Sequence, residues 1–305
     1  MLNPVPVDKH VKAKKHPDLK DFGKPSCKLE DSIKRIPSFK ALRVLSMSLI
    51  SIVAGNLPAF SAEVVPPEKT PVSVTVDLPL LSAVIWRGQV TNIEPLLEPA
   101  LTVGKGGFSI NIQEYVNLTK ASTIHAPEAT ETDITLTYSQ KIQFLETSFG
   151  WSEFLYSNQT YSDAAGNRVA LPGTRELFMS AGIPELPGSP SITVCHDFKE
   201  INGTYYALGT TYNKSFNNGN INFGLSGSVG YGSAAYNKGY FGINNAAFND
   251  MTLGITASIK ASHNLKVIPL VQYVTLLDSA IRNAAKSLYK DNQQVVYSLR
   301  LSYSL

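Results

Sequence analysis

The sequence has little charge, few cysteines and no long apolar run. Charged residues make up 17% of its 305 positions, below the roughly 25% of a typical soluble domain. No stretch reaches the about 18 consecutive apolar residues that a helix needs to span a bilayer. A membrane β-barrel is not excluded by that absence, because its strands place apolar residues only at every second position. The two cysteines, Cys27 and Cys195, leave the body of the chain without an internal disulfide or a metal-binding spacing.

Positive charge is concentrated near the N-terminus. Residues 1–62 hold 11 Lys or Arg against 5 Asp or Glu, whereas residues 63–305 hold 16 against 19. The basic pI of the whole sequence therefore comes from the N-terminal segment and does not indicate nucleic-acid binding.

Residues 1–62 have the pattern of a leader that contains a secretory signal. A polar, basic region extends to Arg43, an apolar run covers residues 44–57, and small residues follow up to Ala62. This order is typical of a signal peptide, with cleavage expected after Ser61 or Ala62. A short buried helix behind a disordered tail is the alternative interpretation.

The basic region is longer than a signal peptide needs, so we expect translation to start at about residue 30, on a non-Met codon. A Pro-rich connector, residues 63–72, follows the leader and precedes the body, residues 73–305.

The C-terminal stretch Val295–Leu305 alternates strictly between apolar and polar residues. One face carries Val295, Tyr297, Leu299, Leu301, Tyr303 and Leu305, and the other carries Val296, Ser298, Arg300, Ser302 and Ser304. Successive side chains of a strand point to opposite sides, so this stretch is predicted to be a strand with one apolar face. It fits the closing strand of a transmembrane barrel as well as an edge strand of a soluble sandwich.

The body contains twelve strand candidates. They cover residues 73–87, 97–103, 108–119, 133–139, 144–156, 175–183, 191–198, 204–213, 220–230, 251–261, 265–276 and 294–305.

The lengths of the connections favour the barrel over the sandwich. The odd-numbered connections are long, with the exception of Lys199–Gly203, and the even-numbered ones are shorter. Long loops on one rim and short turns on the other are the arrangement of outer-membrane barrels. The last long connection holds a predicted helix, Asp278–Tyr289, which could fold over the pore or lie on an outer loop. Aromatic residues near strand ends are expected to form interfacial girdles, namely Trp86, Tyr115, Tyr156, Tyr212, Tyr231 and Tyr303.

Three short motifs carry a family resemblance. Ser82–Gly88 ends in aromatic-Arg-Gly, Gly106–Ser109 opens the third strand, and Ser189–Ser191 together with Asp197-Phe198 marks the seventh. These motifs resemble those of the TorF-like family of bacterial outer-membrane porins. The resemblance implies an antiparallel barrel in the outer membrane that serves as a channel, without enzyme activity or cofactor.

Two residues depart from the expected barrel pattern. Glu114 falls on the lipid-facing side by strict alternation, which a rim position or a neighbouring bulge would resolve. Leu305 stands where barrel proteins more often end in an aromatic residue.

Charged residues on or beside the polar faces are the candidate pore-lining positions. They are Arg87, Glu131, Asp133, Glu146, Glu176, Asp197 and Arg300. Since the first and last strands of a barrel are neighbours, Arg87 and Arg300 are expected on adjoining strands, each pairing with some of these acids. Such a ladder could narrow the pore and select ions, or it could only brace the wall; measuring the ion selectivity of Arg87→Ala in planar bilayers distinguishes the two.

The sequence gives no sign of catalysis or of a cofactor or metal site. Cys195 and His196 are adjacent in a strand, so they face opposite sides and cannot form a nucleophile–base pair. The glycines between Gly224 and Gly232 lack the Lys-Ser/Thr of a phosphate-binding loop.

The sequence therefore predicts an antiparallel, up-and-down transmembrane β-barrel of about twelve strands. The expected function is passive diffusion of small hydrophilic solutes across the outer membrane of a Gram-negative-type bacterium. Outer-membrane lipid and the barrel-assembly machinery are its expected partners. A non-conducting barrel used for surface binding, and a secreted soluble β-sandwich, are the alternatives.

Overall fold

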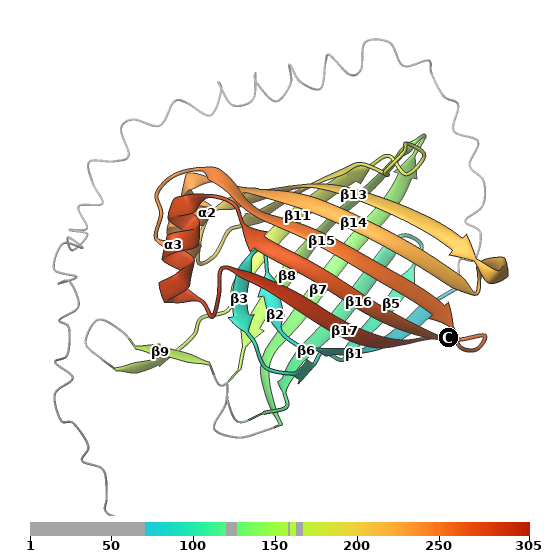
Figure 1. Ribbon diagram of the computed structural model, residues 1–305, viewed down its shortest axis with the longest axis horizontal. Helices are drawn as coiled ribbons and strands as arrows, with labels where there is room; N and C mark the ends of the chain where they lie inside the picture. The colour runs from blue at the N-terminus through green and yellow to red at the C-terminus, as the bar shows by residue number, and fades with distance from the viewer. Residues whose placement is uncertain (1–70, 120–126, 158, 163–166) are drawn as a thin grey trace, which may run out of the picture. The chain divides into compact units, whose positions relative to one another are not determined.

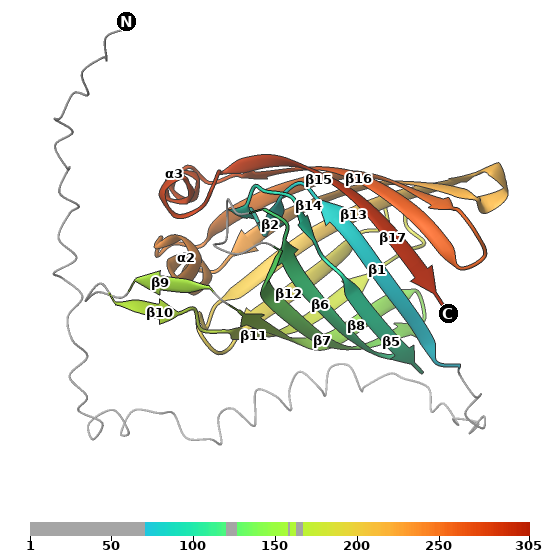
Figure 2. The same cartoon turned by 90° about the horizontal axis from the view of Figure 1, so that it is seen from below.

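The alternating sequence folds into a closed β-barrel (Figures 1 and 2). The computed structural model describes residues 71–119, 127–157, 159–162 and 167–305. The predicted leader, with its signal and cleavage site, lies outside the described residues, as does most of the connector.

Twelve antiparallel strands form the barrel wall. One of them is interrupted at Glu98-Pro99 and consists of β4 and β5. In chain order they are β1 (Ser73–Leu81), β4 (Leu96–Leu97) with β5 (Ala100–Lys105), β6 (Phe108–Asn117), β7 (Glu128–Ile142), β8 (Leu145–Tyr156), β11 (Thr174–Gly182), β12 (Ser191–Asp197), β13 (Thr204–Phe216), β14 (Ile221–Gly232), β15 (Ala247–Lys260), β16 (Leu265–Leu276) and β17 (Gln293–Ser304).

The C-terminal strand closes the sheet. β17 pairs with β16 on one side and with β1 on the other, in a register that sets Val76 opposite Tyr303 and Leu80 opposite Leu299. Closure pairs the backbone groups that would otherwise form open edges, as a sheet surrounded by lipid requires. The soluble-sandwich alternative is therefore wrong, and the predicted barrel is confirmed.

The two faces of the wall differ in polarity as the alternation predicts. On β1, Leu78 and Leu80 are exposed on the outer face, and on β17 Tyr297 and Leu299 are exposed beside them. The inward positions of β14 are instead glycines and polar residues such as Ser226 and Ser228. An apolar exterior around a polar interior is the pattern of a barrel that stands in lipid.

The two rims also differ as predicted. The turn rim carries the short connections, which include the two-residue turn Gly106-Gly107 and the 3₁₀ turn η2 (Asn217–Gly219). The other end, the loop rim, carries long connections that contain secondary structure of their own. These elements are β2 (Val84–Trp86), β3 (Gln89–Asn92), β9 (Thr160–Ser162), β10 (Arg168–Ala170), α2 (Ala234–Phe241) and α3 (Ser279–Leu288). Figure 1 shows α2 and α3 at one end of the barrel and the C-terminus at the other.

Several predicted boundaries need correction. The first strand was expected to extend to Arg87, but β1 ends at Leu81 and the chain then turns into a separate hairpin, β2–β3. The connection 231–250 contains the unpredicted helix α2. The helix expected within residues 278–289 is confirmed as α3, with Asp278 as its N-cap. Within the described residues, no helix has the length and apolar character needed to cross a membrane.

The predicted aromatic girdle is half right. Tyr212, Tyr231 and Tyr303 are exposed on the outer face, and Tyr231 stacks between Tyr206 and Phe248 in an aromatic ladder near the loop rim. Trp86, Tyr115 and Tyr156 instead belong to the barrel interior: Trp86 packs against Phe154 and Tyr240, Tyr115 contacts the inward Gln113, and Tyr156 shares the inward parity of β8.

The outward Glu114 is accommodated locally. A bulge lies next to it, between Tyr115 and Val116, and Thr132 of β7 donates a hydrogen bond of 2.7 Å to its carboxylate. A carboxylate near the loop rim with a hydroxyl partner avoids the cost of an isolated charge in lipid.

Candidate functional site

The loop-rim mouth of the barrel contains an inward-folded hairpin. Trp86 pairs with Gln89, so the two residues between them, Arg87 and Gly88, form the whole turn. Both have positive φ, 49° and 80°, as a type I′ turn requires. Glycine adopts this conformation readily, whereas it costs an arginine about 1–2 kcal/mol. The turn therefore places a strained arginine at the tip of the hairpin.

The tip of the hairpin crosses the mouth and forms an ion pair with the opposite wall. Arg87 donates two hydrogen bonds to Glu176, of 2.7 and 2.6 Å, one to each carboxylate oxygen. Glu176 lies on β11, which is five strands from β1 around the twelve-stranded wall and so is almost diametrically opposite. Both side chains are shielded, with 14% of Arg87 and 3% of Glu176 exposed. Paired hydrogen bonds in a shielded site make this a strong, geometrically specific ion pair.

Aromatic rings enclose the Arg87 guanidinium on both sides. Its central carbon lies 4.3 Å from the ring centre of Trp86 and 4.6 Å from that of Tyr205 on β13, distances at which a cation is attracted to the ring face. The Tyr205 hydroxyl donates to Asp250 on β15 at 2.9 Å, which fixes the ring. Burial lowers the pKa of Arg87, but Tyr236 and Glu176 outweigh it and hold this pKa well above its usual value. The guanidinium is thus permanently charged.

The sides of the hairpin are attached to both loop helices. The Gln89 amide donates to the Tyr236 hydroxyl of α2 at 3.3 Å and accepts from the Tyr289 hydroxyl after α3 at 2.6 Å. The carbonyl of Val90 accepts from the backbone N–H of Lys290 at 3.0 Å. We call the β2–β3 hairpin, α2 and α3 together the cap.

The cap has a small hydrophobic core. Tyr236 and Phe241 of α2 and Ile281 and Ala285 of α3 are buried against Leu276 at the end of β16. Trp86 of the hairpin packs against this group. Burying several large apolar side chains contributes about 1.5–3 kcal/mol each, so the cap is a packed unit over the mouth.

The other predicted site residues occupy four separate places, of which the turn at Asp197 is described below. Glu131 and Asp133 lie on the inward side of β7, near Glu98, whose carboxylate accepts a hydrogen bond of 2.6 Å from Gln113. Arg300 lies on the inward face of β17, with its Nε 3.9 Å from Asp77 of β1. Glu146 lies on the inward parity of β8 near the turn rim.

Arg87 and Arg300 are not on adjoining strands, contrary to expectation. β1 and β17 are neighbours as predicted, but Arg87 has left the wall with the hairpin. Its partner Glu176 lies across the mouth, whereas Arg300 stays at the seam.

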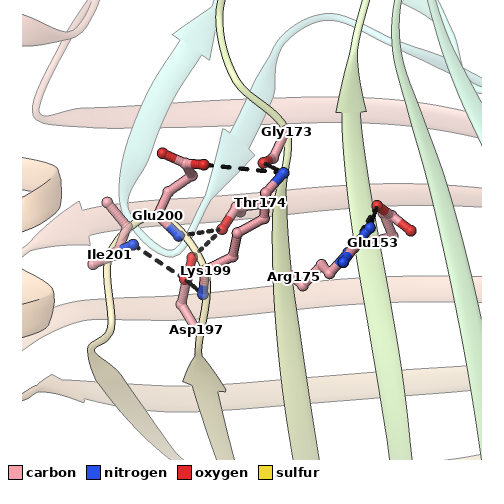
Figure 3. Close-up of polar contacts among 8 residues, drawn as sticks. All are labelled: Glu153, Gly173, Thr174, Arg175, Asp197, Lys199, Glu200 and Ile201. Atoms are coloured by element: carbon pink, nitrogen blue, oxygen red, sulfur yellow. Dashed lines mark hydrogen bonds and ion pairs between the residues drawn. The ribbon is translucent and has the colours of Figure 1, made fainter.

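Asp197 organises a tight turn (Figure 3). Its carboxylate accepts hydrogen bonds from the Thr174 hydroxyl at 2.6 Å and from the backbone N–H groups of Lys199 and Ile201 at 3.0 and 3.1 Å. These hydrogen bonds stabilise the connection without secondary structure of its own. Lys199–Gly203 can therefore be short, unlike the other connections on the loop rim. Asp197 is fully buried and braces the wall.

A second Arg–Glu pair lies on the outside of the barrel. Arg175 donates to Glu153 of β8 at 2.8 and 2.9 Å (Figure 3). Both residues share the strand parity of the exposed Leu155 and Leu177. The side chains of the adjacent residues Arg175 and Glu176 thus lie on opposite faces of β11.

Tyr205, Asp250 and Tyr236 belong to the mouth but were not predicted. Tyr205 lies on the inner face of β13, and only the closed sheet brings β13 and β15 to the tip of a hairpin that follows β1. Within the described residues, no group of His, Cys, Asp and Glu has the arrangement of a metal site.

No protein-family description and no curated protein matches the sequence. Among solved structures, the chain is similar to KdgM porin, with 13% identity and a TM-score of 0.43 over 76% of this chain and 99% of that chain. NanC porin gives 11% identity and a TM-score of 0.44 over 76% and 100%. An outer membrane channel from Pseudomonas putida F1 gives 8% identity and a TM-score of 0.43 over 82% and 100%.

Proposed function

We propose that this protein is a porin-like channel of a bacterial outer membrane, through which small hydrophilic solutes diffuse passively. The observation that carries the proposal is the closed twelve-stranded wall with an apolar exterior and a polar interior. Eight strands already leave an interior just wide enough for side chains, and diameter grows with strand number. Twelve strands therefore leave room for water and small solutes.

We further propose that the cap controls the loop-rim mouth. The hairpin spans the opening and ends in a buried ion pair with the opposite wall, so solutes entering from that side meet the cap first. Glu131, Asp133, Glu146 and Arg300 would then line the path, and Asp197 would brace it. Membership of the TorF-like family, a cleaved secretory leader and insertion by the barrel-assembly machinery complete this proposal.

Planar-bilayer recording tests the channel and its cap together. Removing one partner of a buried ion pair costs about 3–5 kcal/mol, enough to shift a closed–open equilibrium of the cap by about a hundredfold or more. We expect wild-type protein to show discrete conductance steps, and Arg87→Ala and Glu176→Gln to show larger or longer openings.

Arg175→Ala is the matched control, because it removes an Arg–Glu pair from the outer face of the same strand. Its conductance should equal that of the wild type. Silent membranes with all four proteins, each shown to be folded, would refute the channel.

A second candidate function is a non-conducting barrel that binds partners through its loops. The buried cap core favours it, since Phe241, Leu276 and Ile281 pack over the mouth as a protein interior would. Silence of the wild type, with conductance restored by Arg87→Ala, would show that the cap is a permanent seal.

A further inference from the structure

We propose that the wall surface that holds Arg87 is a binding site for guanidinium-bearing solutes, and that the chain's own Arg87 occupies it in the resting state. A free guanidinium compound would compete with Arg87 and release the hairpin. The opening of the channel that follows rests on the proposed function; the binding itself does not.

The carboxylate of Glu176 selects a planar, forked donor. Each of its oxygens accepts one N–H from a different terminal nitrogen of Arg87, at 2.7 and 2.6 Å. A guanidinium presents two parallel N–H groups at this spacing, whereas an ammonium presents a single point charge. The site therefore discriminates by shape as well as by charge.

Tyr205 supplies a stacking surface that does not depend on the hairpin. Its ring lies 4.6 Å from the guanidinium carbon and is oriented by the hydrogen bond to Asp250. Glu176, Tyr205 and Asp250 lie on β11, β13 and β15, all strands of the closed sheet. This half of the site therefore persists when the hairpin moves, while Trp86 leaves with the hairpin.

The occupant is separable from the barrel. β2 and β3 pair only with each other and form a sheet apart from the wall, so the release of the hairpin breaks its bonds to Tyr236, Tyr289, Lys290 and Asn117 but no strand pairing of the wall. Arg87 is held at a positive φ of 49°, and release relieves that strain. A strained, tethered residue in a preformed receptor resembles a bound ligand more than a structural brace.

Tethering sets the concentration at which a free ligand competes. A short flexible tether gives an effective concentration on the order of mM, so free guanidinium compounds should displace Arg87 only at that level or above. Replacing Arg87 by alanine removes this competitor, so the site should then bind free guanidinium compounds more tightly.

The test compares binding of guanidinium and ammonium ions to variants in detergent. The probes are guanidinium chloride, L-arginine amide and ammonium chloride at matched ionic strength, and binding is followed by isothermal titration calorimetry. We expect Arg87→Ala to bind both guanidinium compounds at least tenfold more tightly than wild type and to prefer them over ammonium. The double variant Arg87→Ala, Glu176→Gln should lose this gain.

Arg175→Ala controls for the loss of any Arg–Glu pair and should bind as the wild type does. If Arg87→Ala does not fold, Arg87→Lys serves instead, because its ammonium keeps the charge but cannot fill both oxygens of Glu176. Equal guanidinium binding by the single and double variants would overturn the site.

The outcomes separate the site from the channel. Guanidinium binding in a protein that never conducts would refute the channel and leave the site intact. Conductance without Glu176-dependent guanidinium binding would refute the site and leave the channel intact.

Discussion

At the scale of single residues, the mouth depends on the turn Arg87-Gly88. Arg87 can reach Glu176 only because both turn residues adopt positive φ. Gly88 is also tightly enclosed: a Cβ there would lie 2.5 Å from Leu276 Cδ2 and 2.8 Å from Asp250 Cβ. Position 88 therefore needs glycine for two reasons: the backbone has a positive φ, and its neighbours leave no room for a Cβ.

We predict that Gly88→Ala loosens the cap. The positive φ costs roughly 1 kcal/mol, and overpacking against Leu276 and Asp250 adds about 1–3 kcal/mol. The expected result is larger or longer channel openings in planar bilayers, with the barrel still closed.

Gly219→Ala is the control for Gly88→Ala, because it introduces the same backbone strain without a steric clash. Gly219 has a similar φ of 84°, but nothing lies within 4 Å of a Cβ built there. It stands in a turn on the opposite rim, so its substitution should leave conductance unchanged. Equal effects of the two substitutions would contradict the role given to the Gly88 contacts.

At the scale of elements, α3 connects the cap to the barrel. Asp278 caps its first turn by accepting from the N–H groups of Ala280 and Ile281. One face of the helix carries Ile281 and Ala285 into the cap core, while Leu288, in the last turn, is 56% exposed. The helix therefore contributes one buried stripe to the cap.

Ile281→Asp is predicted to unfold the cap and raise channel conductance. A carboxylate without a partner in an apolar core costs several kcal/mol, more than the packing of a small core can offset. Planar-bilayer recording measures the opening, and the accessibility of Trp86 to an aqueous quencher, in a Trp151→Phe background, measures cap release.

Leu288→Asp provides the control within the same helix. Because its side chain is largely in water already, the substitution should change neither quenching nor conductance. If both aspartates acted alike, helix propensity rather than core packing would explain the result.

At the scale of the whole molecule, closure brings charges from distant strands into one interior. Glu98, Glu131 and Asp133 gather on the wall formed by β4 to β7, whereas Arg300 stands at the β17–β1 seam beside Asp77. Lys266 of β16 pairs with Ser302 and so shares this inward face, but Arg300 is the cation that lies beside Asp77 at the seam.

We predict that Arg300→Ala increases the preference of the channel for cations. A unit charge about 8 Å from a permeating ion in water changes its energy by roughly 0.5 kcal/mol, so the permeability ratio should change about twofold or more. Reversal potentials in a KCl gradient measure this ratio.

Lys214→Ala is the control, because Lys214 stacks on Phe216 near the turn rim and has the outward parity of the exposed Tyr212. It should leave the ratio unchanged. An unchanged ratio for Arg300→Ala would assign Arg300 a bracing role only.

The wall of the barrel is specified by patterns that are local in the sequence. Alternation along each segment fixed which side chains face lipid, because successive side chains of a strand point to opposite sides. The alternating loop lengths fixed the up-and-down order, and the pattern of Val295–Leu305 identified the closing strand. These are local properties, so the residues that carry them are neighbours in the chain.

The group that fills the mouth depends on tertiary contacts. The alternation of apolar and polar residues in β1 continues through Ser82–Gly88, so the sequence predicts that this stretch is the end of the strand. No local pattern indicates that it folds inward. Arg87 meets Glu176, Tyr205 and Asp250 only after closure sets β11, β13 and β15 around the opening. The cap therefore arises from contacts between residues far apart in the chain, which periodicity along one strand cannot encode.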